Sequence, residues 1–322
     1  MRPGKTSPRN SPMSDGGKKS RRELRVVNGV LLLNKPAGLT SNQALQRVKR
    51  LFRARKAGHT GSLDPAATGM LPLCLGEATK ISAYLLDADK CYRVTAALGA
   101  RTDTGDADGQ VVATAEVPGL EFAQWEAILE SFLGESQQIP PMYSALKQGG
   151  KRLYELARKG EVVDRAPRKI NVTEIALLEA RGTRLVFRVR CSKGTYVRTL
   201  VEDIAAKAGT LAHTAHLYRE TVADFEESAM LDMEQLEALA AEGESQLDAA
   251  LLPVDQGLPA WPSVRLDEVQ EAAFGQGQPV PMDGRGPQGF RRVYDEAGRF
   301  LGIARMLDDG RLAPERLFRL DA

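Results

Sequence analysis

Residues 58 to 69 read GHTGSLDPAATG, and Asp64 is the one carboxylate in this segment. From Lys35 to Asp64 the chain carries seven Lys or Arg and no other acid. Pro65 disfavours a helical conformation for the residue before it, while the glycines permit tight turns and close backbone approach. We therefore expect a shaped loop that presents a single carboxylate among positive charges.

An isolated aspartate can act as a nucleophile or a general base without a cofactor, provided that it stays ionised. Burial would raise the pKa of Asp64, and a nearby guanidinium would lower it again. Arg198 is our candidate for that partner, because arginine keeps its charge when buried and can bind a carboxylate through two nitrogens. Tyr92 offers a flat ring on which a base could stack. Taken singly, each of these residues could also be purely structural.

Positive charge is unevenly distributed along the 322 residues. The net charge is only +2, yet residues 220–264 hold eleven acids and no Lys or Arg. Outside that stretch, 31 of the 42 acids remain against all 44 basic residues, a net charge of +13. The division predicts one face for a polyanion and another turned away from it, although a merely solvated acidic helix would give the same pattern.

The composition is that of an ordinary globular protein of about two domains, with 43% hydrophobic and 27% charged residues. Cys74, Cys91 and Cys191 lie too far apart in sequence for a disulfide framework or a C-x-x-C motif. No apolar run approaches the ~18 residues of a membrane span, and the basic N-terminus lacks the apolar stretch of a signal peptide. We expect a cytoplasmic protein with no membrane attachment.

Strands and a helix are expected to position the N-terminal half of the site. The apolar run from Val26 predicts a strand that ends in a Pro-Gly turn, after which Ser41 would cap a helix to about Lys56. The basic residues of that helix lie opposite its apolar arc, where they would meet phosphate or water. The alternating stretch 90–98 predicts a strand with Tyr92 on its inner side.

A second strand and helix are expected to position Arg198. Residues 184–191 (RLVFRVRC) alternate as a strand with its apolar side facing inward. The SKGT turn then leads into a helix that Thr195 would cap, with Tyr196 and Arg198 in its first turn.

Metal chemistry finds little support in the sequence. The turn 101–109 resembles a calcium loop, but Thr104 and Ala115 fall where that loop needs carboxylates. His213 and His216 have helical spacing, but no third zinc ligand is evident. Phosphate-binding and dinucleotide-binding fingerprints are also missing. No metal and no cofactor are expected.

Composition also suggests the domain plan. Residues 1–24 are polar and basic and are expected to be a disordered tail. A main domain would span residues 25–254 and carry a mobile basic insertion at about 130–170. The segment 255–322 predicts short strands joined by tight turns, and hence a small separate β domain.

Five segments, in this order, resemble the bacterial TruB family of tRNA pseudouridine synthases: NGVLLLNKPAGLTSN, AGHTGSLDPAATGMLPLCLGEATK, YRVTAALGARTDTGDADG, IPPMYSALK and CSKGTYVRTL. The resemblance covers about residues 28–220. It implies an α+β pseudouridine synthase fold, in which helices flank a mixed, largely antiparallel central sheet. It also implies that residues 255–322 form a PUA-like RNA-binding domain.

The resemblance implies that uridine 55 in the T loop of tRNA is isomerised to pseudouridine without a cofactor. The base would be flipped into the pocket at a cost of about a few kcal/mol. Asp64 matches the catalytic aspartate, which assists cleavage of the bond between N1 and the ribose before the uracil rejoins through C5. Attack at C1′ and removal of the 2′ proton both remain open as routes.

The remaining roles are carried over from the same motifs. Tyr92 matches the tyrosine that stacks on the target base and could help to remove the C5 proton. Tyr196 and Arg198 match residues that line the pocket, with Arg198 pairing with Asp64. The remaining matches are to substrate-binding positions and comprise His59, Leu217 and Lys35, the last from a motif that also supports the active loop.

The resemblance also implies the partners. The basic insertion would close over the T arm of tRNA, and we expect a monomer with no obligatory protein partner. Two other functions compete with this one: an RNA-binding or tRNA-folding protein in which turnover matters little, and an Asp-dependent hydrolase. We rank the hydrolase last because the sequence shows neither the second carboxylate nor the metal that such chemistry needs.

Overall fold

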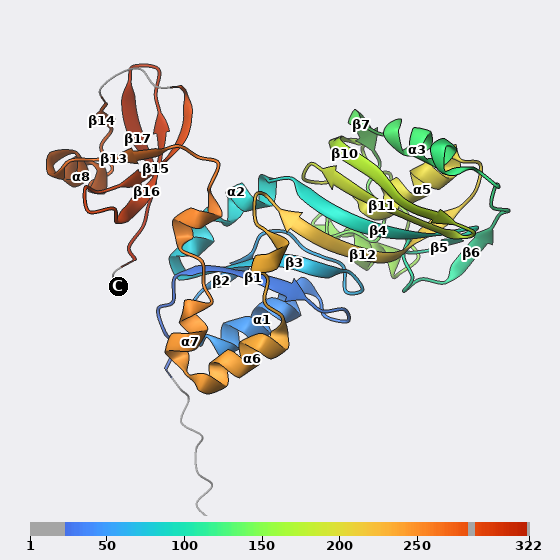
Figure 1. Ribbon diagram of the computed structural model, residues 1–322, viewed down its shortest axis with the longest axis horizontal. Coiled ribbons are helices and arrows are strands. Elements are labelled where there is room, and N and C mark those ends of the chain that lie inside the picture. Colours follow the sequence, from blue (N-terminus) through green and yellow to red (C-terminus); the bar gives the residue numbers. More distant parts are fainter. Residues whose placement is uncertain (1–22, 283–286, 321–322) are drawn as a thin grey trace, which may run out of the picture.

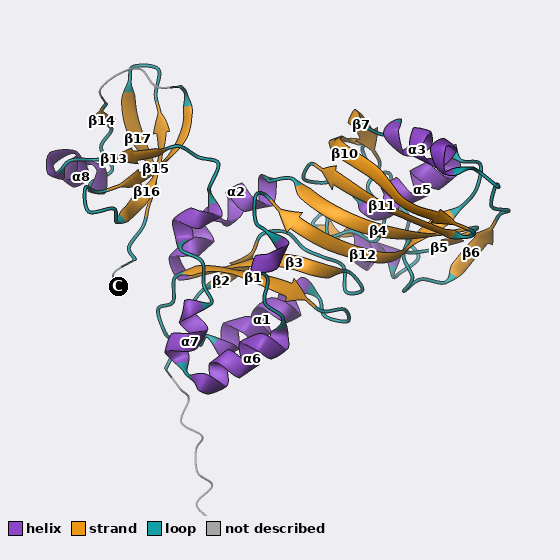
Figure 2. Cartoon of the chain, in the orientation of Figure 1, coloured by secondary structure: helices purple, strands orange, loops and turns teal. Residues whose placement is uncertain are grey.

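The computed structural model describes residues 23–282 and 287–320, and the tail expected at 1–24 lies almost wholly outside this range. A large sheet forms the centre of the molecule, and a smaller sheet near the C-terminus stands apart from it (Figure 1). Helices α3 and α5 pack against one face of the large sheet, while α1 and α6 pack against its β1 and β3 end (Figure 2).

The large sheet has eight strands in the order β1-β3-β12-β4-β11-β10-β7, with β2 paired to β3. All of its pairings are antiparallel except that of β12 with β3. This mixed, largely antiparallel sheet with flanking helices confirms the predicted fold class. Its strands are β1 (Gly29–Lys35), β2 (Ala57–His59), β3 (Thr68–Leu75), β4 (Lys90–Leu98), β7 (Gly134–Gln138), β10 (Arg168–Arg181), β11 (Arg184–Cys191) and β12 (Ala212–Val222).

Eight α-helices and two small hairpins also occur within the described residues, together with three short 3-10 helices. None of these helices has the length and apolar content that a membrane crossing would require. The helices are α1 (Ser41–Leu51), α2 (Ser82–Asp87), α3 (Phe122–Glu130), α4 (Leu153–Ala157), α5 (Val197–Lys207), α6 (Met233–Glu242), α7 (Glu244–Ala249) and α8 (Glu268–Gly275). The hairpins pair β5 (Ala100–Thr102) with β6 (Val111–Thr114), and β8 (Lys147–Gln148) with β9 (Lys151–Arg152).

Two predicted strands are confirmed at their predicted bounds. β4 spans residues 90–98 and β11 spans residues 184–191. Leu185, Phe187 and Val189 are completely buried against α3 and α5, whereas the arginines on the other side of the strand are exposed or half-buried. Val186, on that other side, is also buried. The period of two therefore placed the core face of this sheet correctly.

The helix boundaries differ from the prediction. Thr40, not Ser41, caps α1, because the Thr40 hydroxyl accepts the N–H of the third helical residue. α1 ends at Leu51 and not near Lys56, since Arg53 adopts a left-handed conformation with φ of 50°. Thr195 does not cap α5, whose N-cap is Tyr196 and has no side-chain cap.

The basic side of α1 does not simply face water or phosphate as predicted. The acidic helices α6 and α7 lie against α1, so Glu237 pairs with Arg47 at 2.5 Å and Glu244 pairs with Arg53. Asp248 of α7 also pairs with Arg25. Part of the acidic stretch therefore neutralises charge within the molecule.

The C-terminal strands form a separate five-stranded sheet in the order β13-β15-β16-β17-β14, which confirms the predicted β domain. An aromatic contact joins it to the main domain, with Trp261 stacked on Phe290 at 4.6 Å and Tyr84 edge-on to both. Its strands are β13 (Ser263–Arg265), β14 (Val280–Pro281), β15 (Gly289–Tyr294), β16 (Phe300–Met306) and β17 (Arg311–Leu317).

Candidate active site

A cleft of about 570 Å³ opens beside the GHTGSLDPAATG loop, at the strand ends of β4 and β12. This volume suits a nucleoside-sized ligand. Five of the seven residues predicted from the sequence line it, namely Asp64, Tyr92, Tyr196, Arg198 and Leu217. Its walls are rich in positive charge, supplied by Lys90, Arg168, Lys169, Lys193 and Arg219.

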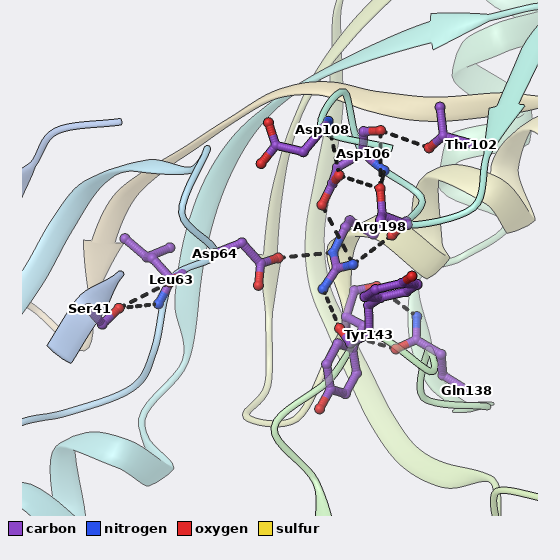
Figure 3. A network of polar contacts seen from close by, with 11 residues as sticks. Ser41, Leu63, Asp64, Thr102, Asp106, Asp108, Gln138, Tyr143 and Arg198 are labelled. Atoms are coloured by element: carbon purple, nitrogen blue, oxygen red, sulfur yellow. Dashed lines mark hydrogen bonds and ion pairs between the residues drawn. The ribbon is translucent and has the colours of Figure 1, made fainter. Parts of the chain in front are cut away.

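Arg198 pairs with Asp64, with the Nε atom 2.9 Å from Oδ2 (Figure 3). The predicted two-nitrogen contact is wrong, because the other guanidinium nitrogens bind backbone. Nη1 donates to the Thr104 carbonyl at 2.6 Å, and Nη2 donates to the Tyr143 carbonyl at 2.8 Å. Three separate segments therefore hold this arginine, which is only 6% exposed.

Opposing effects act on the Asp64 carboxylate. Burial raises its pKa above the usual range, and the charge of Asp106 adds to that rise. The Arg198 charge and hydrogen bond, together with the charge of Lys35, lower the pKa and offset part of the effect. The side chain is nevertheless 43% exposed toward the cleft, so a ligand can reach its oxygens.

Asp106 is a site residue that the sequence reasoning missed. Its Oδ2 lies 3.6 Å from Nη1 of Arg198, so Asp64 is not the only acid facing that arginine. Its Oδ1 accepts the Thr104 hydroxyl at 2.5 Å and the Asp108 N–H at 3.2 Å. Both oxygens are thus occupied by protein groups, which leaves Asp106 poorly placed to act as the second acid of a hydrolase. In the sequence, the turn 101–109 that carries Asp106 resembles only an incomplete calcium loop, which gives no sign of a contact with Arg198.

Lys35 does not line the cleft, and its contact with substrate stays a prediction. It is completely buried, and its Nζ donates to the carbonyls of Pro36, Leu39 and Pro65. Burial lowers the pKa of Lys35 to about 8. Because Pro65 follows Asp64 directly, Lys35 holds the loop that carries Asp64 in place.

Ser41 supports the same loop from the start of α1. Its Oγ accepts the Leu63 N–H at 2.8 Å and donates to the Leu63 carbonyl at 3.1 Å (Figure 3). The residue predicted to cap a helix therefore binds the backbone of the residue before Asp64. The loop is tied on both sides of its carboxylate.

Two tyrosines form walls of the cleft. Tyr92 stands on β4, directly opposite Arg219 of β12, and burial raises its pKa above the usual range. Tyr196 precedes α5, and its backbone is fixed by the Gln138 side chain, which accepts its N–H at 2.8 Å and donates to its carbonyl at 3.1 Å. Gln138 is a second supporting residue that sequence reasoning did not find, because its partner lies 58 positions away.

None of the three histidines lines this cleft. His59 lies on β2 and does not line the cleft, although its Nδ1 is buried without a hydrogen-bond partner. His213 contacts the Ala100 carbonyl at 2.9 Å, and His216 contacts the Thr68 hydroxyl at 3.4 Å. No cluster of three or more metal-binding side chains occurs in the described part of the chain.

Models of known protein families match most of the chain. Residues 49–197 match the N-terminal domain of the TruB family of pseudouridylate synthases. Residues 198–259 match the C-terminal domain of tRNA pseudouridylate synthase B, and residues 262–318 match the C-terminal region of the pseudouridine synthase II TruB.

Whole-length relatives point the same way. Proteins named tRNA pseudouridine synthase B from Stutzerimonas stutzeri and Yersinia pestis are 50% and 51% identical, covering 93% and 92% of this chain and 98% and 94% of the relatives. The solved structure of a Cbf5-Nop10-Gar1 complex contains a chain of the same fold, with a TM-score of 0.72 at 24% identity, over 91% of this chain and 86% of that one. The chain therefore belongs to the TruB family of pseudouridine synthases.

Proposed function

We propose that this protein isomerises uridine 55 in the T loop of tRNA to pseudouridine, with Asp64 assisting cleavage of the glycosidic bond. The observation that carries the proposal is the Asp64 carboxylate, paired with a buried arginine at 2.9 Å and open to a nucleoside-sized cleft. Relatives of about 50% identity over almost the whole chain are named for tRNA pseudouridine synthesis, which supports the choice of substrate.

The cleft accepts one nucleotide that has left its stack. The cost of flipping, about a few kcal/mol, is offset by stacking on Tyr92 and by contacts with the backbone phosphates. Asp64 either attacks C1′ or removes the 2′ proton, and in both routes the uracil departs, turns and rejoins through C5. Leu217 and Tyr196 confine the base while it turns.

The basic surroundings supply affinity for the rest of the RNA. Arg168, Lys169 and Lys193 line the cleft entrance at strand and helix ends, where phosphates of the T arm can reach them. The segment between β7 and β10 closes over the arm, and the PUA-like domain from residue 255 adds further RNA contacts. The protein works as a monomer in the cytoplasm without a metal or an organic cofactor.

Substitution of Asp64 by Asn tests the chemistry. Asn has nearly the same shape and lacks the negative charge, so we expect no product while the affinity for an unmodified T-arm stem-loop changes by no more than a few-fold. Nucleosides are separated by chromatography and identified by mass spectrometry after incubation in the presence of a chelator. Asp203→Asn, on α5 outside the cleft, is the matched control and should retain activity.

The same experiment separates this function from an RNA-binding or tRNA-folding role. Both functions predict affinity that falls as salt rises, because phosphate contacts release counterions. Only the synthase predicts product from the wild-type protein and its loss with Asp64→Asn. A stem-loop with cytidine at the target position should bind and yield no product. Conversion retained by Asp64→Asn would remove this carboxylate from the mechanism.

A further inference from the structure

Arg219 is the largest completely buried side chain among the described residues. It stands on β12, opposite Tyr92 of β4 and opposite Gly69 of β3. Its backbone approaches Gly69 so closely that a Cβ atom there would lie 2.3 Å from the Arg219 carbonyl oxygen. The arginine is therefore fixed in the wall of the cleft, which it lines together with Asp64 and Tyr92.

This guanidinium has no carboxylate partner in the described structure. Nε donates to the Met70 carbonyl at 2.6 Å, and Nη2 donates to the Gly61 carbonyl at 3.2 Å. Among the described residues no ion pair includes Arg219, whereas the next residue, Glu220, pairs with Arg93 and Arg188. A buried cation without a counter-charge costs several kcal/mol. Such a group is maintained where an anion, or a charge that develops during a reaction, can meet it.

The neighbouring cations Lys90 and Arg198 are less free to bind an anion in the cleft, because protein groups already use most of their donors. The Lys90 ammonium also lines the cleft, but it donates to the carbonyls of Leu85, Leu86 and Ala88, which occupies its three protons. Arg198 is already committed to Asp64 and to two carbonyls. Arg219 has five N–H groups, of which two donate to carbonyls and one can bond the Tyr92 hydroxyl, so it retains donors for a ligand beside Tyr92.

The proposed reaction generates negative charge in this part of the cleft. When the bond from N1 to C1′ breaks, its electron pair leaves with the uracil, whether Asp64 has attacked C1′ or removed the 2′ proton. The departing base is then an anion whose charge is shared between its ring nitrogens and its carbonyl oxygens. It keeps that charge until it bonds again through C5.

Building on the proposed function, we propose that Arg219 is a further catalytic residue, which donates to a uracil carbonyl oxygen and stabilises the negative charge formed as the glycosidic bond breaks. A preorganised donor of this kind is worth about 10²–10³-fold in rate. The Arg219 charge and hydrogen bond also oppose the rise that burial causes in the pKa of Tyr92, so Arg219 lies close to the ring on which the base would stack.

The test compares leaving groups. Stem-loops carrying uridine or 5-fluorouridine at the target position are incubated under single-turnover conditions with the wild type, Arg219→Gln and Arg219→Lys. The rate measured is the loss of the original N1-linked nucleotide, because 5-fluorouridine has no C5 proton to release and cannot complete the conversion to pseudouridine. Fluorine withdraws electrons and stabilises the departing anion, so that base needs less help. We expect Arg219→Gln to be about 10²–10³-fold slower on uridine, and its loss on 5-fluorouridine to be at least about tenfold smaller. The rate of Arg219→Lys should lie between those of the wild type and Arg219→Gln.

The controls separate catalysis from loop support. Arg93→Gln, an exposed arginine of the same sheet, should match the wild type on both substrates. Stem-loop affinity should change by less than about threefold for each Arg219 variant, and thermal unfolding monitors folding. If Arg219→Gln does not fold, the Arg219→Lys losses on the two substrates decide the question. Equal losses on uridine and 5-fluorouridine would overturn the inference and leave the function standing, whereas a wild type without product would refute the function itself.

Discussion

Replacing Arg198 by Met should move the pH dependence of catalysis. In the proposed mechanism Asp64 acts as an anion by either chemical route, so activity should rise as the pH passes upward through its pKa. Burial already raises that pKa, and the Arg198 charge is the main effect that lowers it. Without the guanidinium the carboxylate holds its proton to higher pH, and the acidic limb of the profile shifts upward.

The size of the shift follows from the contact. Unit charges 2.9 Å apart attract by about 6 kcal/mol at an effective dielectric constant of about 20. Asp64 is 43% exposed, so solvent screens part of this attraction. A rise of about one to three pKa units, equivalent to about 1.4–4 kcal/mol, is what we expect. Arg198→Lys keeps the charge, so its limb should move by less than about half a unit.

Single-turnover rates on the T-arm stem-loop between about pH 5 and 9 measure the shift. Arg198→Lys should also show a lower plateau, because a single ammonium cannot hold Asp64 and the carbonyls of Thr104 and Tyr143 together. Thermal unfolding of both variants checks that the protein stays folded when these two carbonyls lose their hydrogen-bond donor. An acidic limb of Arg198→Met that coincides with that of the wild type would refute the electrostatic reasoning.

Three further predictions concern the supports of the site. Gly69→Ala should lower the free energy of unfolding by at least about 2 kcal/mol, since φ is 96° and the new Cβ would meet the Arg219 backbone. Gly38→Ala is the control: its φ is 82° but its surroundings are open, so it should cost only about 1–2 kcal/mol. Chemical unfolding measures both. Burial lowers the folded-state pKa of Lys35 to about 8. The wild type should therefore gain stability relative to Lys35→Met as the pH rises from 8 toward 10, by up to about 1.4 kcal/mol per pH unit. A stability difference that does not change with pH would contradict this. Tyr92→Phe keeps the ring and loses the hydroxyl, so affinity should hold within about twofold while release of tritium from C5 slows at least about tenfold; an unchanged release rate would exclude the hydroxyl from that step.

Local signals in the sequence were sufficient for two strands of the central sheet, β4 and β11, whereas β12, which lines the cleft beside β4, was not predicted. The alternation at 90–98 and 184–191 depends on neighbours two positions apart, so it can be read without knowing the fold. Helix ends were harder to predict. Ser41 has the chemistry of a cap, but tertiary contact directs its hydroxyl to Leu63 instead. The dispersed charge of α1 likewise gave no sign that α6 and α7 would neutralise part of it.

The sequence by itself determined the loop that carries Asp64, because glycine and proline set the backbone conformations available locally and a single acid among basic residues is visible in the order of the chain. It also identified Arg198 as the partner of Asp64. Only the tertiary structure decided what surrounds that pair. Asp106, Gln138 and Arg219 reach the site through pairings between distant strands and turns, and no local pattern encodes such pairings. The same holds for burial: the sequence does not show that the Lys35 ammonium is completely enclosed and holds the loop through the Pro65 carbonyl.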